Sequence, residues 1–124
     1  MTVGQPLVMA VAMLGAGLQA SGVEEPLSAP DAIATQVQVQ LHRHYADRDR
    51  LAVLDRIFII ERRIGAYRAA RSRAELIGRL NADLRVATRD PRVCVGERSR
   101  PAAPGIHAVA LEGGLGLFVP DTLP

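Results

Sequence analysis

The sequence predicts a mostly α-helical fold, a three-helix bundle over residues 31–95 followed by a short C-terminal strand or β-hairpin. Three observations lead to this prediction. Apolar residues recur at helical spacing in three consecutive segments, good capping residues precede these segments, and short β-prone runs follow near the C-terminus. The 124-residue chain is long enough for one domain, and with only 3% aromatic residues its core is expected to be aliphatic.

Residues 1–22 are predicted to be a secretory signal peptide. Their apolar run, Leu7–Leu18, is too short to span a bilayer and has the length of a signal peptide's hydrophobic region. Small residues follow, so cleavage is expected after Gly22 or after Ala20. Because the segment contains no Arg or Lys, an apolar N-terminus that remains attached is the alternative. We expect an exported chain, periplasmic or extracellular, without a stable membrane span, and a short linker at residues 23–30.

The stretch QVQVQLHRHY, residues 36–45, has two interpretations. Its Gln and Val residues alternate as in a half-buried strand, in which His42 and His44 would point the same way and could share a metal ion. It also belongs to a stripe of residues at four-residue spacing, which is typical of one face of a helix: Ile33, Val37, Leu41 and Tyr45.

The residues before this stretch favour the helix. Ser28 can cap a helix, and Pro30 is tolerated in a first turn. We predict a helix from Pro30 to about residue 46, with the Gln residues facing solvent or flanking the stripe and Val39 off the stripe. In a helix, His42 and His44 lie about 200° apart. They are therefore expected to be surface residues and not a metal-binding pair.

A second helix is predicted to follow Asp47 or Asp49, either of which can cap it. The run Ile57–Ile60 favours a strand in isolation, but charged residues flank it at helical spacing, and we therefore keep the helix. Gly65 weakens the helix near its end. Its apolar face is expected to be broad: Leu54, Ile57, Phe58, Ile60 and Ile64.

The third helix has the clearest boundaries. Ser72 and Glu75 have the spacing of a capping box, in which each side chain accepts a hydrogen bond from the other residue's backbone N–H. Pro91 disfavours helix at the residue before it. Arg79 and Asp83 lie four residues apart and are expected to pair weakly. The apolar stripe comprises Leu76, Ile77, Leu80, Leu84 and Ala87.

The C-terminal part of the chain has β character. RVCV is predicted to be a short strand, and residues 96–124 form a Pro/Gly-rich tail in which IHAVAL and LGLFV can make a hairpin around EGG. An isolated hairpin is marginally stable, so this one needs the helices, a partner chain or more sequence. Cys94, the single cysteine, cannot form an internal disulfide and is expected to be a buried or edge-strand thiol.

The charge distribution is uneven. The net charge of +2 combines fifteen basic residues, all of them Arg, with thirteen acidic ones, and every Arg lies within residues 43–100. One basic group is a possible contact for an anion or an acidic partner: Arg62, Arg63, Arg68, Arg71 and Arg73. The alternative is a solvated turn. Because no aromatic side chains are expected to stack alongside this group, as they do in proteins that bind single strands, nucleic acid is not the expected partner.

No catalytic, cofactor-binding or metal-ligating residues are predicted. The chain has no Cys/His cluster at zinc spacing, no Gly-x-Ser-x-Gly elbow and no phosphate-binding loop ending in Gly-Lys. The absence of lysine also excludes a Ser/Lys dyad within these residues. The sequence therefore favours a module without catalytic machinery of its own.

Three short patterns occur in order within residues 31–95: a Gly-x-Tyr connection (Gly65–Tyr67), a Leu-x-x-Asp-Leu-Arg segment (Leu80–Arg85) and an Asp turn that enters a strand (Asp90–Val93). Together with a preceding helix that ends in a tyrosine, they resemble the N-terminal helical domain of the tail-specific (C-terminal processing) serine protease family, in the branch of interphotoreceptor retinoid-binding protein. The sequence departs from the family pattern at Arg92, where the family usually has His.

The resemblance implies a helical bundle that precedes a catalytic domain, which would supply the nucleophilic serine and, in tail-specific members, a lysine base. The expected function is that of a non-catalytic domain, truncated before the catalytic domain, that packs on a peptidase core or guides polypeptide substrate to it. Two alternatives remain: a basic helical module that binds nucleic acid or an anionic surface, and a fragment without a selected function.

Overall fold

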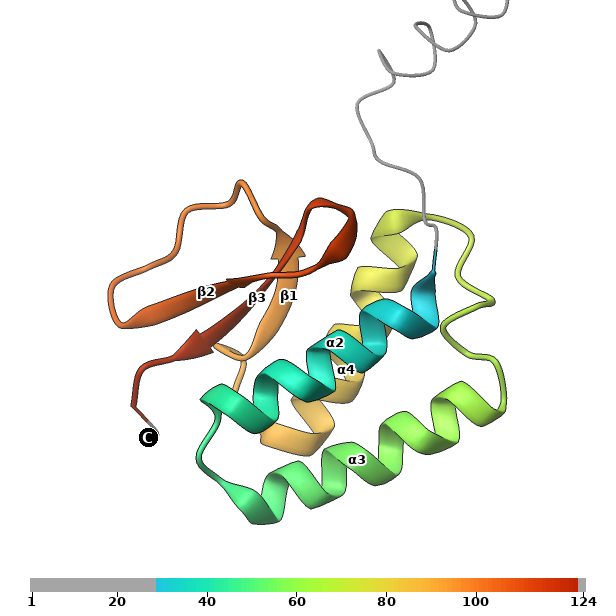
Figure 1. The fold of residues 1–124 in the computed structure, drawn as a ribbon, viewed down its shortest axis with the longest axis horizontal. Coiled ribbons are helices and arrows are strands. Elements are labelled where there is room, and N and C mark those ends of the chain that lie inside the picture. The colour runs from blue at the N-terminus through green and yellow to red at the C-terminus, as the bar shows by residue number, and fades with distance from the viewer. Residues whose placement is uncertain (1–28, 123–124) are drawn as a thin grey trace, which may run out of the picture.

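The computed structural model describes residues 29–122 and confirms the mostly α-helical fold class. Three helices precede a small antiparallel sheet (Figure 1). The helices are α2 (Pro30–His44), α3 (Arg48–Arg63) and α4 (Arg73–Thr88), and the strands are β1 (Cys94–Glu97), β2 (Ile106–Ala110) and β3 (Leu115–Pro120). The predicted signal peptide, most of the linker and the proposed Ser28 cap lie outside the described residues.

Helix α2 confirms the helical interpretation of the Gln/Val stretch. Ala29 occupies the cap position and Pro30 the first turn, and the helix ends at His44, two residues before the expected end. The apolar stripe is buried from Ile33 to Tyr45, while Val39 is exposed as predicted. The stripe is buried because one side of α2 faces α3 and another faces β3.

Helix α3 begins as predicted and ends in a glycine motif. The Asp47 carboxylate accepts a hydrogen bond from the backbone N–H of Arg50 at 3.1 Å. At the other end Gly65 has a φ of 76°, and the N–H groups of Gly65 and Ala66 donate to the carbonyls of Arg62 and Glu61. These two bonds make a Schellman motif, so Gly65 stops the helix by supplying the left-handed residue that the motif requires.

The broad apolar face predicted for α3 is only partly right. Leu54 and Phe58 are buried and Ile57 is partly buried against the core, but Ile60 and Ile64 are exposed. Helix α3 packs against α2 and α4 along one stripe. Ile60 and Ile64 face away from that stripe, and they are exposed because no other element in residues 29–122 covers them.

The start of α4 is a variant of the predicted capping box. Ser72 Oγ accepts the N–H of Glu75 at 3.1 Å, as expected. The Glu75 carboxylate, however, accepts the N–H of Arg71 and not that of Ser72. This hydrogen bond holds the pKa of Glu75 below its usual value. The helix ends at Thr88 because Arg89 takes the left-handed conformation, with a φ of 54°.

The expected pairing of Arg79 with Asp83 is wrong. Arg79 instead contacts Glu75, one turn earlier, at 3.3 Å, and it donates to the Ala66 carbonyl in the loop before α4. Asp83 accepts a hydrogen bond from the Tyr67 hydroxyl at 2.7 Å. Arg79 and Asp83 therefore both contact the α3–α4 loop. Their spacing along one helix does not predict these partners.

The predicted hairpin is confirmed, and β1 adds a third strand. The sheet order is β1-β3-β2 with both pairings antiparallel, so that β3 is the central strand and its Phe118 lies opposite Cys94 on one side and Ala108 on the other. A short 3₁₀ turn, η1 (Glu112–Gly114), connects β2 to β3. Cys94 lies on an edge strand and is partly buried, as predicted for the thiol.

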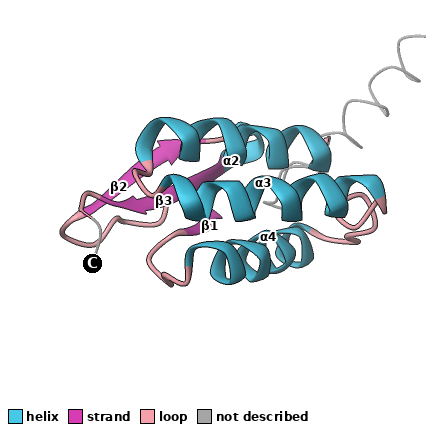
Figure 2. Ribbon diagram, turned by 90° about the horizontal axis from the view of Figure 1, so that it is seen from below, coloured by secondary structure: helices cyan, strands magenta, loops and turns pink. Residues whose placement is uncertain are grey.

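The sheet and the helices share one hydrophobic core. β1 packs on α4 and β3 packs on α2, so these two helices lie between the sheet and α3 (Figures 1 and 2). The side-chain amide of Asn81 bonds both backbone groups of Val95, at 2.9 and 2.6 Å, and thereby joins α4 to β1. The hairpin is thus supported by the helices and by β1, which supplies what an isolated hairpin lacks.

Candidate functional site

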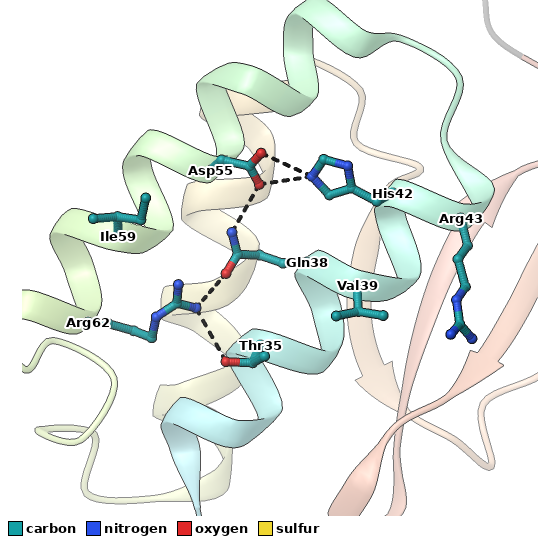
Figure 3. A pocket seen from close by; sticks show the side chains of 8 residues that line it. All are labelled: Thr35, Gln38, Val39, His42, Arg43, Asp55, Ile59 and Arg62. Carbon is teal, nitrogen blue, oxygen red and sulfur yellow. Dashed lines mark hydrogen bonds and ion pairs between the residues drawn. The ribbon is translucent and has the colours of Figure 1, made fainter.

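A groove on the outer side of α2 and α3 is the candidate functional site (Figure 3). Its volume is about 600 Å³. On each helix the lining residues recur at spacings of three and four, which places them on one face. They are Thr35, Gln38, Val39, His42 and Arg43 from α2, and Asp55, Ile59 and Arg62 from α3.

A chain of polar contacts joins the two walls of this groove. The Asp55 carboxylate accepts a hydrogen bond from Gln38 Nε2 at 3.0 Å, and His42 Nε2 lies 3.0 Å from both of its oxygens. Arg62 donates to the Gln38 side-chain carbonyl and, at 3.5 Å, to Thr35 Oγ1. Figure 3 shows these contacts running from His42 to Thr35. Gln38 thus flanks the stripe as expected and connects the two helices.

Exposed apolar side chains lie beside this polar chain. Val39 of α2 is 44% exposed and Ile59 of α3 is 46% exposed, and both line the groove. Ile60 is 54% exposed, and Ile64, at the C-cap of α3, is 69% exposed. Ile60 and Ile64 are four residues apart and therefore lie on the same side of α3. These three isoleucines, Ile59, Ile60 and Ile64, are called the isoleucine face below.

The structure disperses the arginine group predicted as an anion or partner contact. Arg62 belongs to the groove, and Arg68 forms an ion pair with Asp31 at the start of α2. Arg73 is buried and contacts Glu97 of β1 through two hydrogen bonds of 2.8 and 2.9 Å. Arg63 and Arg71 are exposed. The five side chains thus lie in several different settings.

The two histidines of α2 also have separate surroundings. His42 faces Asp55 across the groove, whereas the ring of His44 lies next to that of His107 in β2. Both are exposed, as the helical interpretation predicted. Within residues 29–122, no group of three or more His, Cys, Asp or Glu residues has an arrangement that could hold a metal ion.

A hydrogen-bonded pair, Tyr67 and Asp83, connects the α3–α4 loop to α4, and the sequence did not indicate it. The Tyr67 ring is fully buried and packs edge-on against Phe58 with centroids 5.5 Å apart. Burial, followed by the hydrogen bond to Asp83, raises the pKa of the Tyr67 hydroxyl. Burial and the nearby Glu61 carboxylate raise the pKa of Asp83 to about 6. Because no surface of Tyr67 is open to a substrate, the pair serves to hold the loop in place.

No family model, no curated protein and no solved structure matches the chain. The relationship to tail-specific serine proteases therefore stays a prediction from the sequence. Among the helices in residues 29–122, none is long and apolar enough to cross a membrane.

Proposed function

We propose that this chain is a non-catalytic helical module that packs on the core of a tail-specific serine peptidase or guides polypeptide substrate to it. The observation that carries the proposal is the isoleucine face, with the adjoining groove between α2 and α3. The resemblance of residues 31–95 to the N-terminal domain of tail-specific serine proteases indicates a peptidase core as the partner. The exposed apolar side chains supply the surface by which a protein would be bound.

The energetics of this face suit a protein partner. Full burial of an isoleucine side chain contributes about 1.5–3 kcal/mol, so covering three partly exposed ones supplies a substantial share of a binding free energy. The face is bordered by Arg56 and Arg63, two exposed arginines of α3. A partner with an apolar centre and acidic residues around it would match this pattern, since charged residues are usually found at the rim of an interface.

The alternative function, a basic module for nucleic acid or an anionic surface, receives less support. Arg68 and Arg73 have carboxylate partners within the chain, and Arg62 donates to Gln38 and Thr35. These contacts would have to be broken or shared before the arginines could bind phosphate. If the arginines are engaged in this way, the chain should bind heparin only weakly. Its retention should then change little between about 50 and 200 mM salt.

The proposal is tested with the full 124-residue chain and the catalytic domain of a tail-specific serine peptidase from which the helical domain has been removed. Titration calorimetry measures the dissociation constant, and hydrolysis of a polypeptide substrate measures kcat/KM with and without the chain. We expect binding, with Ile60→Asp weakening it at least about tenfold, which corresponds to about 1.4 kcal/mol.

Val86→Asp is the matched control, because Val86 is 64% exposed on α4, away from the groove. It should bind as the unmodified chain does. Absence of binding would contradict the proposal, and so would equal weakening by the two variants, because equal weakening would show that the isoleucine face has no special part in the contact.

A further inference from the structure

His44 and His107 are brought together by the fold from opposite ends of the described chain. His44 is the last residue of α2, and His107 lies in β2, where it is paired with Val119 of β3. Their ring centroids are 4.9 Å apart and the rings are tilted by 41°. Both side chains are exposed and line a hollow of about 180 Å³ together with Val119, Pro120 and Asp121.

The ring separation is the one expected for two imidazoles that share a metal ion. Zinc binds a histidine nitrogen at about 2.0–2.1 Å, and two imidazoles bound to one ion at an angle of about 100° have their centroids about 5 Å apart. The observed centroid distance of 4.9 Å matches this value, so the two rings are spaced for one shared ion. Imidazole is a preferred ligand of zinc, nickel and copper ions.

We propose that His44 and His107 form a two-histidine site for a divalent late first-row transition metal ion, which clasps α2 to the hairpin. The lining of the hollow suits a cation, because among the described residues it includes the acidic Asp121 and no Arg, while Arg43 and Arg48 line the hollow on the other side of His44. Since these residues contain no three-ligand metal cluster, water completes the coordination of the ion. The hollow opens to solvent, so that ion and water have access.

His42 and His44 have different surroundings, although both belong to α2. The Nε2 of His42 lies 3.0 Å from both oxygens of Asp55, on the groove side of α2. The ring contact with His107 is made by His44. Two nearby histidines on one helix are thus expected to behave differently toward a metal ion. Because only His44 has His107 beside it, only His44 can chelate together with the hairpin.

The test is titration of the untagged full-length chain with zinc chloride and with nickel chloride, followed by calorimetry and by thermal unfolding. We expect one ion per chain and a rise in melting temperature, since a ligand that binds only the folded state stabilises it. His44→Ala and His107→Ala should each weaken binding at least about tenfold and abolish the rise, because a single remaining imidazole cannot chelate. The double variant His44→Ala/His107→Ala should bind the ion no more weakly than either single variant.

His42→Ala is the matched control and should bind as the unmodified chain does. Circular dichroism of each variant without metal shows that the fold is retained. The proposal is overturned if neither ion binds, if His42→Ala weakens binding as much as His44→Ala, or if only one of the two proposed ligands matters. Because these measurements do not involve a peptidase, they succeed or fail independently of the function proposed above.

Discussion

Helices α3 and α4 have the same length, 16 residues, and both begin with a side-chain cap, yet they are buried very differently. The buried residues of α4 run along its whole length, from Arg73 to Thr88. Those of α3 end at Phe58, and Ile59 and Ile60 in its last turns are exposed. The helix with the run of isoleucines is therefore the less completely buried of the two.

The difference comes from the neighbours of each helix. Helix α4 has α3 on one side and β1 on the other, whereas α3 packs against α2 and α4 along one stripe (Figures 1 and 2). An apolar side chain is buried only where another element meets it, whatever its own hydrophobicity. Helix α4 is thus packed on two sides, and the last turns of α3 leave exposed the apolar side chains that are proposed above as a binding surface.

The largest losses of stability are expected at fully buried positions, such as the centre of α4. Leu80 is fully buried, so Leu80→Ala should lower the free energy of unfolding by about 2–5 kcal/mol, through lost burial and the cavity left behind. Urea denaturation measures this change. Val86→Ala on the exposed side of the same helix is the control and should change stability by less than about 0.5 kcal/mol. A loss below about 0.5 kcal/mol for Leu80→Ala would place this residue outside any core.

Asp83→Asn is expected to raise the free energy of unfolding at neutral pH, by an intermediate amount. Burial raises the pKa of Asp83 to about 6 from 3.8, so the folded state binds its proton more tightly than the unfolded state does. This contribution to stability is full below about pH 4 and is lost as the pH rises through about 6. The amide of Asn still offers an oxygen to the Tyr67 hydroxyl, but it has no charge to be desolvated.

Asp83→Asn should therefore raise the free energy of unfolding at pH 7 by about 1–2 kcal/mol, less than the full value of two pKa units because the group is only partly buried. Urea denaturation between pH 4 and pH 7 measures it. Carboxylates with a lowered pKa, such as those of Asp90 and Glu97, act in the opposite direction in both proteins, so the difference isolates position 83. Parallel pH curves would contradict the assignment.

The smallest effect is expected on the exposed side of α3. Ile60→Ala removes a side chain that is 54% exposed, and it should change the free energy of unfolding by less than about 0.5 kcal/mol. Phe58→Ala, two residues earlier at a fully buried position, is the contrast and should cost about 3–5 kcal/mol. A cost for Ile60→Ala above about 2 kcal/mol would mean that this part of α3 is covered in the folded chain.

Much of the fold could be predicted because its signals are local. Each of these signals depends on residues within a few positions of one another. They are the caps at Asp47 and Ser72, the stripe of α2, the stop before Pro91 and the hairpin around η1. The candidate groove could not be predicted in the same way. Its residues come from two helices. The isoleucine face was missed as well, because the sequence pattern predicted Ile60 and Ile64 in the core and the packing of the helices leaves them exposed.

The sequence by itself determined the three helices, their approximate ends and the β-strands near the C-terminus, because backbone preferences, caps and hydrophobic spacing act over one or two turns. Only the tertiary structure decided the partners of the charged and aromatic groups: Arg73 with Glu97, Asp83 with Tyr67, and His44 with His107. These pairs join residues from 16 to 63 positions apart along the chain. Their meeting depends on how the helices pack on one another and on the sheet, which no local pattern specifies.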